Sequence, residues 1–98
     1  MKTNINYEGN TYEINVTEWT KRPKANGIYV MIKNPVYGDI LNLIKHTLEI
    51  SYNISINQMF TMNKSIGFRI DNFDKTLSVG MIAITLAELK KQINRGDK

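Results

Sequence analysis

Few side chains in this sequence have the types and the spacing that catalysis or metal binding requires. His46 is the only histidine, and it lies three residues before Glu49, a spacing at which two side chains of a helix can touch. Zinc takes three or four protein ligands, and no third ligand accompanies this pair. The absence of cysteine excludes thiolate metal sites and cysteine nucleophiles. We therefore predict a solvated helix face here and no metal site.

Asp71 and Asp74 form a second candidate pair. Two neighbouring carboxylates can perform general acid and base chemistry or hold a hard cation. Aspartate is also frequent in turns, because its side chain hydrogen-bonds the backbone two residues further on. Glycine-rich phosphate loops and the zinc-protease motif are absent from the sequence. The sequence therefore predicts a turn at 71–74, a protein that is not an enzyme, and no cofactor.

The length and composition limit the chain to one domain, residues 1–98. With 98 residues, of which 42% are hydrophobic, there is material for one modest core. No apolar run is long enough to span a membrane, so we expect a cytoplasmic protein without a membrane partner. Fourteen isoleucines, twelve asparagines and ten lysines against three arginines suggest an AT-rich genome. A plasmid or phage is our predicted source.

The excess of positive charge is concentrated in one short segment. Thirteen basic against nine acidic residues leave a net charge of +4. Lys21, Arg22 and Lys24 follow Trp19 within a few residues, and such a positive segment beside an aromatic ring suits phosphate binding. A solvated surface loop has the same composition. Both interpretations stay open at this point.

Hydrophobic periodicity predicts the first half of the fold. Alternating apolar residues indicate a β-hairpin over 4–16 with its turn at Gly9 and Asn10. A polar loop is expected over 17–27 and a buried strand over 28–32. Apolar residues at helical spacing then predict a helix over 39–50, with Asp39 as its N-cap.

The second half contains one ambiguous segment, residues 54–63. It suits either a short helix, with Ile56, Met59 and Phe60 inward, or a strand, and we favour the helix. Alternation at 66–70 and again at 77–81, around the turn at 71–74, predicts a second hairpin. Thr85 and Glu88 form a capping box that begins a C-terminal helix. Its apolar stripe is Leu86, Leu89 and Ile93. The predicted class is α+β.

The element order from Gly27 onward is strand, helix, turn, helix and hairpin. This order resembles the winged helix-turn-helix of small DNA-binding proteins, with 39–50 as the first helix, 54–63 in the recognition position and 64–81 as the wing. The resemblance implies a winged-helix-like fold that binds duplex DNA without catalysis. Because 54–63 contains no Lys or Arg, the phosphate contacts are expected from the hairpin.

The candidate DNA-binding residues are polar or basic side chains on these elements. Arg69 lies between Phe68 and Ile70 and so faces away from the core, where its fork can read guanine or hold a phosphate. The full set is Arg69, Lys64 and Lys75 on the hairpin, Asn57, Gln58, Thr61 and Asn63 for base edges, and Lys21, Arg22 and Lys24 in the loop. The predicted function is that of an accessory or regulatory DNA-binding protein.

A protein partner is the competing hypothesis. A small α+β domain without catalytic residues also suits an inhibitor of host defence or an assembly factor encoded by a phage or plasmid. Its anchors would be aromatic, because buried aromatic residues dominate interface energies. The candidates are Trp19, Tyr29, Tyr37, Tyr52 and Phe73. Under either hypothesis we expect a homodimer, formed by sharing the apolar stripe of the C-terminal helix.

Overall fold

The protein folds as a small α+β domain, which confirms the predicted class. The computed structural model describes residues 1–22, 25–33, 38–72 and 77–96. The described elements are β1 (Lys2–Tyr7), β2 (Asn10–Arg22), β3 (Ala25–Lys33), α1 (Gly38–Tyr52), β4 (Met59–Met62), β5 (Ser65–Asp71) and α2 (Val79–Gly96). The predicted helix over 39–50 and strand over 28–32 are confirmed as α1 and β3.

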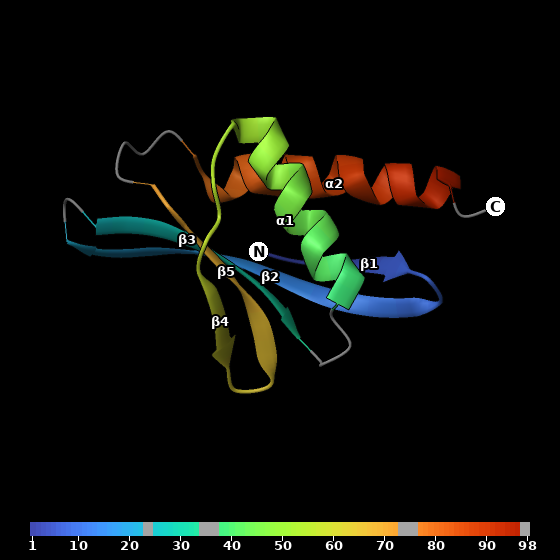
Figure 1. Cartoon of the computed structure of the whole chain (residues 1–98), viewed down its shortest axis with the longest axis horizontal. Coiled ribbons are helices and arrows are strands. Elements are labelled where there is room, and N and C mark those ends of the chain that lie inside the picture. Colours follow the sequence, from blue (N-terminus) through green and yellow to red (C-terminus); the bar gives the residue numbers. More distant parts are fainter. Residues whose placement is uncertain (23–24, 34–37, 73–76, 97–98) are drawn as a thin grey trace.

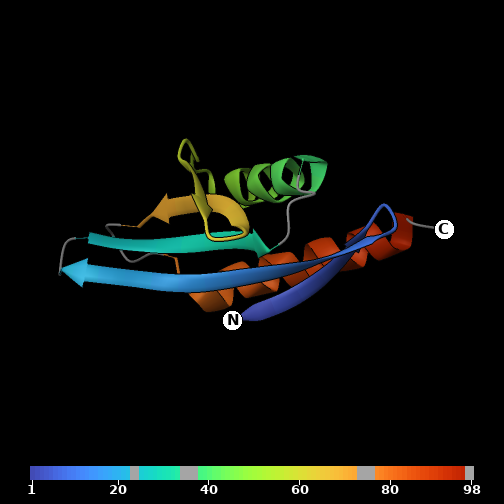
Figure 2. The ribbon, with the colours of Figure 1, turned by 90° about the horizontal axis from the view of Figure 1, so that it is seen from below.

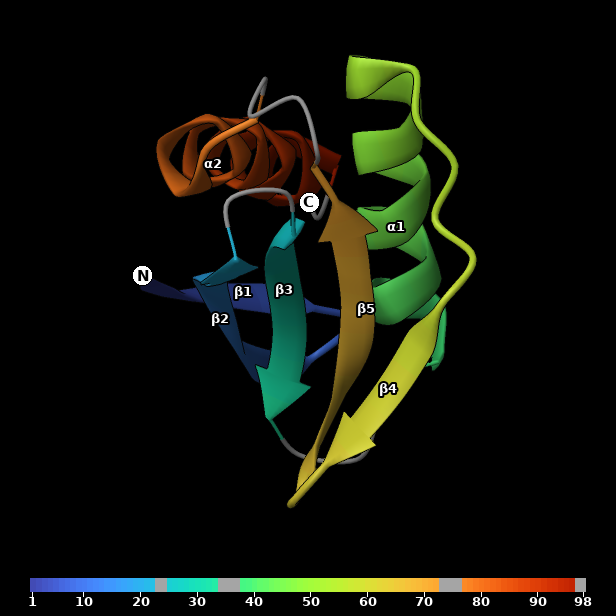
Figure 3. The same cartoon turned by 90° about the vertical axis from the view of Figure 1, so that its left-hand side faces the viewer.

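The strands form one antiparallel sheet in the order β1-β2-β3-β5-β4. Strand β5 enters between β3 and β4, so α1 connects two strands that are not direct neighbours. Both helices lie on the same face of the sheet (Figure 1). Helix α2 lies over β1 and β2, and α1 lies on the β5 side (Figure 3). The opposite face, toward the viewer in Figure 2, carries neither of the two described helices, and we call it the open face.

The core fills the space between the sheet and the two helices. Alternate residues of the strands point into it, and each helix adds the apolar stripe that its spacing predicts. The buried core residues include Ile5, Ile14, Val16, Ile28, Val30, Ile32, Phe68 and Ile70 of the sheet, Ile40, Leu41, Ile44 and Leu48 of α1, and Ile82, Leu86 and Leu89 of α2. Because Leu86 and Leu89 pack inside their own domain, they do not supply the dimer surface that was expected of them.

The first hairpin is confirmed, but its turn and the loop after it differ from the prediction. Glu8 and Gly9 have φ angles of 50° and 82°, so they, rather than Gly9 and Asn10, are the two central residues of the turn. The loop predicted over 17–27 is wrong. Strands β2 and β3 continue through most of it, because the backbone pairing extends to Trp19 opposite Gly27 and beyond.

The helix predicted over 54–63 is also wrong. Helix α1 ends at Tyr52, and the next residue, Asn53, has a φ of 53° that reverses the chain; the Ile54 N–H bonds back to the Glu49 carbonyl at 3.1 Å. The Glu49 carboxylate accepts a second backbone bond, from Ile56 N–H at 2.9 Å. These bonds hold the start of segment 54–58 against the end of α1. The segment forms no helix, and β4 begins directly after it. This segment therefore does not form the recognition helix that the winged-helix resemblance implied.

The second hairpin exists but is formed by other residues. It joins β4 to β5 through Asn63 and Lys64, with a φ of 56° at Asn63. The strand predicted over 77–81 is wrong, because α2 starts at Val79 and Ser78 Oγ accepts the Met81 N–H at 3.2 Å as its N-cap. The capping box at Thr85 and Glu88 is therefore wrong as well, since both residues lie inside α2.

At Gly67 the backbones of β3 and β5 leave no room for a side chain, and replacing this residue tests their pairing. A Cβ at this position would lie 1.9 Å from the Val30 carbonyl oxygen and 2.7 Å from Met31 Cα. We expect Gly67→Ala to lower the free energy of unfolding in urea by about 2–3 kcal/mol or more, because backbone must move. Gly80→Ala is the control, since its Cβ would meet only Ser78 Oγ at 3.8 Å and alanine favours the helix. Equal effects of the two substitutions would show that the strands do not approach this closely at Gly67.

Candidate functional site

The open face is built from the strand residues that alternate with the core residues. Neighbouring strands are in register, so their outward residues form rows across the sheet, such as Thr17, Tyr29 and Arg69. The face comprises Lys2 of β1, Glu13, Asn15, Thr17 and Trp19 of β2, Tyr29, Met31 and Lys33 of β3, Phe60 and Met62 of β4, and Arg69 of β5. It carries aromatic and basic side chains together.

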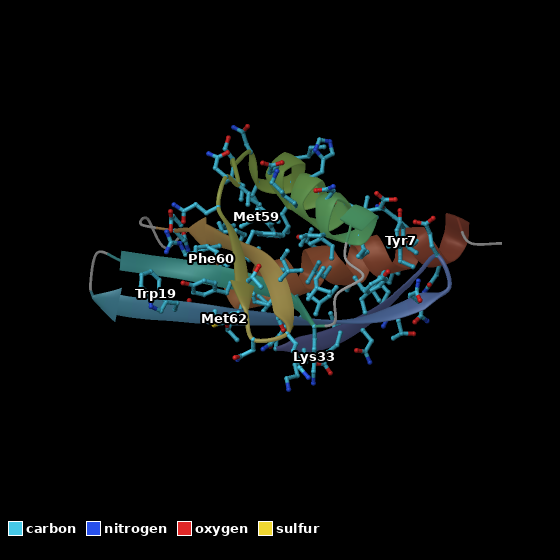
Figure 4. The ribbon with its side chains drawn as sticks, turned by 60° about the horizontal axis from the view of Figure 1, so that its bottom comes forward. Tyr7, Trp19, Lys33, Met59, Phe60 and Met62 are labelled. Carbon is cyan, nitrogen blue, oxygen red and sulfur yellow. The ribbon has the colours of Figure 1, made fainter. Side chains whose placement is uncertain are left out.

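Three aromatic rings and one arginine form a cluster at one end of the open face. The Trp19 and Tyr29 ring centroids are 6.3 Å apart, and those of Tyr29 and Phe60 are 5.7 Å apart, both in edge-to-face geometry. All three rings are half-buried. Gly27 makes room, because a Cβ there would lie 3.1 Å from the Trp19 ring. We call Trp19, Tyr29, Phe60 and Arg69 the aromatic cluster; Figure 4 shows Trp19 and Phe60 on it.

Arg69 holds this cluster together. Its guanidinium carbon lies 5.7 Å from the Trp19 ring centroid and 5.4 Å from the Phe60 centroid, within cation–π range of both. Nη2 donates to Gln58 Oε1 at 2.6 Å, and Nε lies 2.8 Å from Asp71 Oδ1. The Nε contact is an ion pair by distance and not a directed hydrogen bond. Within the described residues Nη1 donates no hydrogen bond, so part of the fork is available to a ligand.

A hollow adjoins the cluster on the same face. Its volume is about 340 Å³, and it is lined by Lys2, Glu13, Asn15, Thr17, Tyr29, Met31, Lys33, Met62, Asn63 and Ser65. Tyr29 belongs to both the hollow and the aromatic cluster, so the two are continuous. In Figure 4 Lys33 lies at the lower edge of the molecule, to the right of Met62. The open face thus offers stacking surfaces at one end and ammonium groups with hydrogen-bonding side chains at the other.

Charge is distributed unevenly between the two sides of the molecule. Among the side chains that the structure describes, the open face and its rim carry four basic groups (Lys2, Lys33, Lys64 and Arg69) and two acidic groups (Glu13 and Asp71). The other described positions carry three basic groups (Lys45, Lys90 and Lys91) and five acidic groups (Glu8, Glu18, Asp39, Glu49 and Glu88). The described charges therefore favour an anion on the open face over one on the helix side.

The structure brings together only some of the residues predicted from the sequence. Arg69 and Gln58 are hydrogen-bonded, and Asn63 lines the hollow. Lys64 is exposed in the β4–β5 turn. Thr61 and Asn57 are exposed but lie off the open face, Thr61 on the opposite side of β4 and Asn57 in the segment before it. Lys21 and Arg22 end β2 with side chains outside the described part, and Lys24 and Lys75 lie outside the described residues.

Sequence reasoning missed Phe60, Lys2 and Lys33 as members of the site. Phe60 was assigned to the core because 54–63 was interpreted as a helix, whereas on β4 it points to the open face. The alternation of β3 was the available signal for Lys33, since Lys33 follows Tyr29 and Met31 at every second position. Of the proposed aromatic anchors, Trp19 and Tyr29 are in the cluster, Tyr52 bonds to α2, and Tyr37 and Phe73 lie outside the described residues.

A second hollow, of about 440 Å³, lies on the helix side at the start of α1. It is lined by Tyr7, Asp39, Asn42, Leu43, Lys45, His46 and Glu49. Desolvation and the neighbouring carboxylates of Glu8 and Asp39 raise the pKa of the Tyr7 phenol. Among the described residues no three His, Asp or Glu side chains gather to hold a metal ion. One oxygen of the Glu49 carboxylate, Oε2, accepts a hydrogen bond from the Ile56 N–H.

Comparison with protein-family models, curated proteins and solved structures finds no match for this chain. Neither helix in the described part of the chain is both long enough and apolar enough to cross a bilayer.

Replacing Arg69 tests its role as the organiser of the cluster. Trp19 is the only tryptophan, so its fluorescence reports on this site alone. We expect Arg69→Met to shift the Trp19 emission to longer wavelength and to lower the free energy of unfolding by about 1–2 kcal/mol, because the ring and Asp71 both lose their partner.

Two further variants make the result specific. Arg69→Lys keeps the charge but not the planar fork, so we expect an intermediate effect. Lys64→Met removes a charge from the exposed β4–β5 turn and should leave both observables unchanged. An unchanged emission spectrum in Arg69→Met would show that the guanidinium does not order the rings.

Proposed function

We propose that this protein binds single-stranded nucleic acid, without catalysis, through the open face of its sheet. The observation that carries the proposal is the continuity of the aromatic cluster with a lysine-lined hollow on a face that no helix covers. Unpaired bases stack on aromatic side chains of sheet surfaces, and basic groups beside them follow the phosphates. Trp19, Tyr29 and Phe60 are assigned to stacking, and Lys2, Lys33 and Lys64 to phosphate contacts.

Single strands fit this face better than the duplex DNA that the sequence suggested. In a duplex the base faces are covered by their neighbours, and sequence is read from base edges by a helix or ribbon that enters a groove. A hollowed sheet face presents rings to base faces, which only unpaired nucleotides expose. We assign Arg69 part of its predicted role, since its Nη1 group makes no hydrogen bond to another described residue. An accessory or regulatory role on a plasmid or phage remains a prediction from composition.

Stacking is tested by titrating the Trp19 fluorescence with an oligothymidylate of about ten nucleotides, within the site size of such folds. We expect quenching at about 50 mM salt and weaker binding as salt rises. Phe60→Leu keeps an apolar side chain but removes the ring, and it should weaken binding about 5- to 100-fold, since stacking contributes about 1–3 kcal/mol per base. Tyr7→Leu removes a half-buried ring outside the open face and should bind like the wild type.

The phosphate contacts are tested by a pair of lysine substitutions. Lys33→Ala removes a charge from the hollow, and Lys91→Ala removes one from an exposed position on α2. We expect Lys33→Ala alone to reduce the dependence of log affinity on log salt by about 0.7, the value for one phosphate of a single strand. Equal slopes for the two variants would count against the hollow as the phosphate site.

Two other outcomes would redirect the proposal. Binding of a duplex of the same sequence more tightly than the single strand would favour the duplex hypothesis and exclude stacking as the main contribution. An absence of binding to either form at about 50 mM salt would overturn the proposal, because non-specific binding is strongest at low salt. The aromatic cluster would then be the surface for the alternative hypothesis, a protein partner of an inhibitor or assembly factor.

A further inference from the structure

Strand β4 is an edge of the sheet whose outer side is exposed. It is the last strand in the sheet order, and no described strand pairs with its outer side. The exposed fractions of Met59 and Met62 are 45% and 50%, and Thr61 between them is exposed as well. A strand in this situation presents a row of backbone groups that another strand can pair with.

The backbone groups that point outward can be assigned from the pairing with β5. The Arg69 N–H bonds to the Gln58 carbonyl, and the register places Phe60 opposite Gly67 and Met62 opposite Ser65. Hydrogen-bonded residues alternate along an antiparallel strand, so residues 58, 60 and 62 turn their N–H and C=O groups toward β5. Residues 57, 59 and 61 therefore turn theirs to the outside.

This edge lacks the features that usually prevent strand pairing. Charged residues, prolines and bulges are the common protections of an edge strand. Residues 51–63 contain no charged residue and no proline, and the β4–β5 register runs without a shift. The other edge strand, β1, carries the charged Lys2. The two edges thus differ, and β4 is the one open to pairing.

We propose that two copies of this chain pair through β4, antiparallel, about a two-fold axis at Phe60. Phe60 then lies opposite the partner's Phe60, Met59 opposite the partner's Thr61, and Gln58 opposite the partner's Met62. This register joins outward-pointing groups at 59 and 61 and keeps both helix layers on one side of the extended sheet. A second copy fits because its β4 is the kind of strand that this edge accepts: extended, uncharged and free on its outer side.

The pairing joins the two open faces into one. The rings of Phe60 from both copies meet at the centre, so each copy contributes a residue to a continuous aromatic surface. Pairing of so short a strand buries little area, and we expect a weak dimer that assembles between about 1 µM and about 1 mM. The dimer forms without nucleic acid, so its test is independent of the proposed function.

Sedimentation equilibrium of two Thr61 variants tests the edge. Thr61→Pro removes an outward N–H and leaves the bonds to β5 intact, whereas Thr61→Val keeps the N–H and is the control. We expect the wild type and Thr61→Val to dimerise alike, and Thr61→Pro to dimerise at least about tenfold more weakly, because the symmetry removes two hydrogen bonds. A wild type that stays monomeric to about 1 mM, or a folded Thr61→Pro that dimerises like the wild type, overturns the proposal.

Disulfide formation tests the register, and it also tests whether two copies pair through β4 if Thr61→Pro does not fold. The chain has no cysteine of its own, so single variants Gln58→Cys and Met62→Cys each carry one thiol. The proposed register brings these two positions of different copies within disulfide distance, but separates each from its own counterpart by about 13 Å. We expect rapid cross-linking only when the two variants are mixed. Cross-linking of each variant alone as fast as in the mixture, or none in the mixture, overturns the proposal.

Discussion

The close approach of β3 and β5 at Gly67 is the contact on which both the sheet and the candidate site depend. A Cβ at this position would overlap the Val30 carbonyl and touch Met31, so the two strands can pair only because the residue is glycine. The same pairing places Arg69 opposite Tyr29, and β4 then places Phe60 opposite Gly67. The register that closes the core on one face therefore also sets the positions of the aromatic and basic groups on the other.

A sheet covered by helices on one face exposes the side chains of its other face to water. Here Trp19, Tyr29 and Phe60 are half-buried against one another and around one guanidinium, which limits the apolar area in contact with water. Edge-to-face pairs contribute about 0.5–1.5 kcal/mol beyond the area that they bury. Because paired strands hold the rings, the cluster is ordered before any ligand arrives. A ligand that uses it loses less free energy to the ordering of side chains than one that binds mobile groups.

Local sequence patterns predict the elements that local interactions determine. The first hairpin, β3 and α1 follow from alternation and helical spacing over their own residues. Val79 and Met81 misled the prediction because two alternating residues cannot distinguish a strand from the first turn of a helix. The pattern that predicts the start of α2 correctly is the helical spacing of Val79, Ile82, Leu86 and Leu89, with Ser78 as the N-cap. For β4 no local signal suffices, because its conformation depends on pairing with β5.

In the candidate site, too, local patterns predict some features, whereas others depend on contacts between distant segments. Alternation alone predicts that Arg69 faces away from the core, and it does so. Its partners, however, are supplied by β2, β4 and the end of β5, and no local pattern brings Trp19, Phe60 and Asp71 together. These contacts change what Arg69 can contribute. A guanidinium that is paired with Asp71 and stacked between rings mainly organises the surface, so under the proposed function the described groups left for phosphate are the exposed lysines, Lys2, Lys33 and Lys64. Under the proposed function, stacking on Trp19, Tyr29 and Phe60 then adds to the attraction of these lysines.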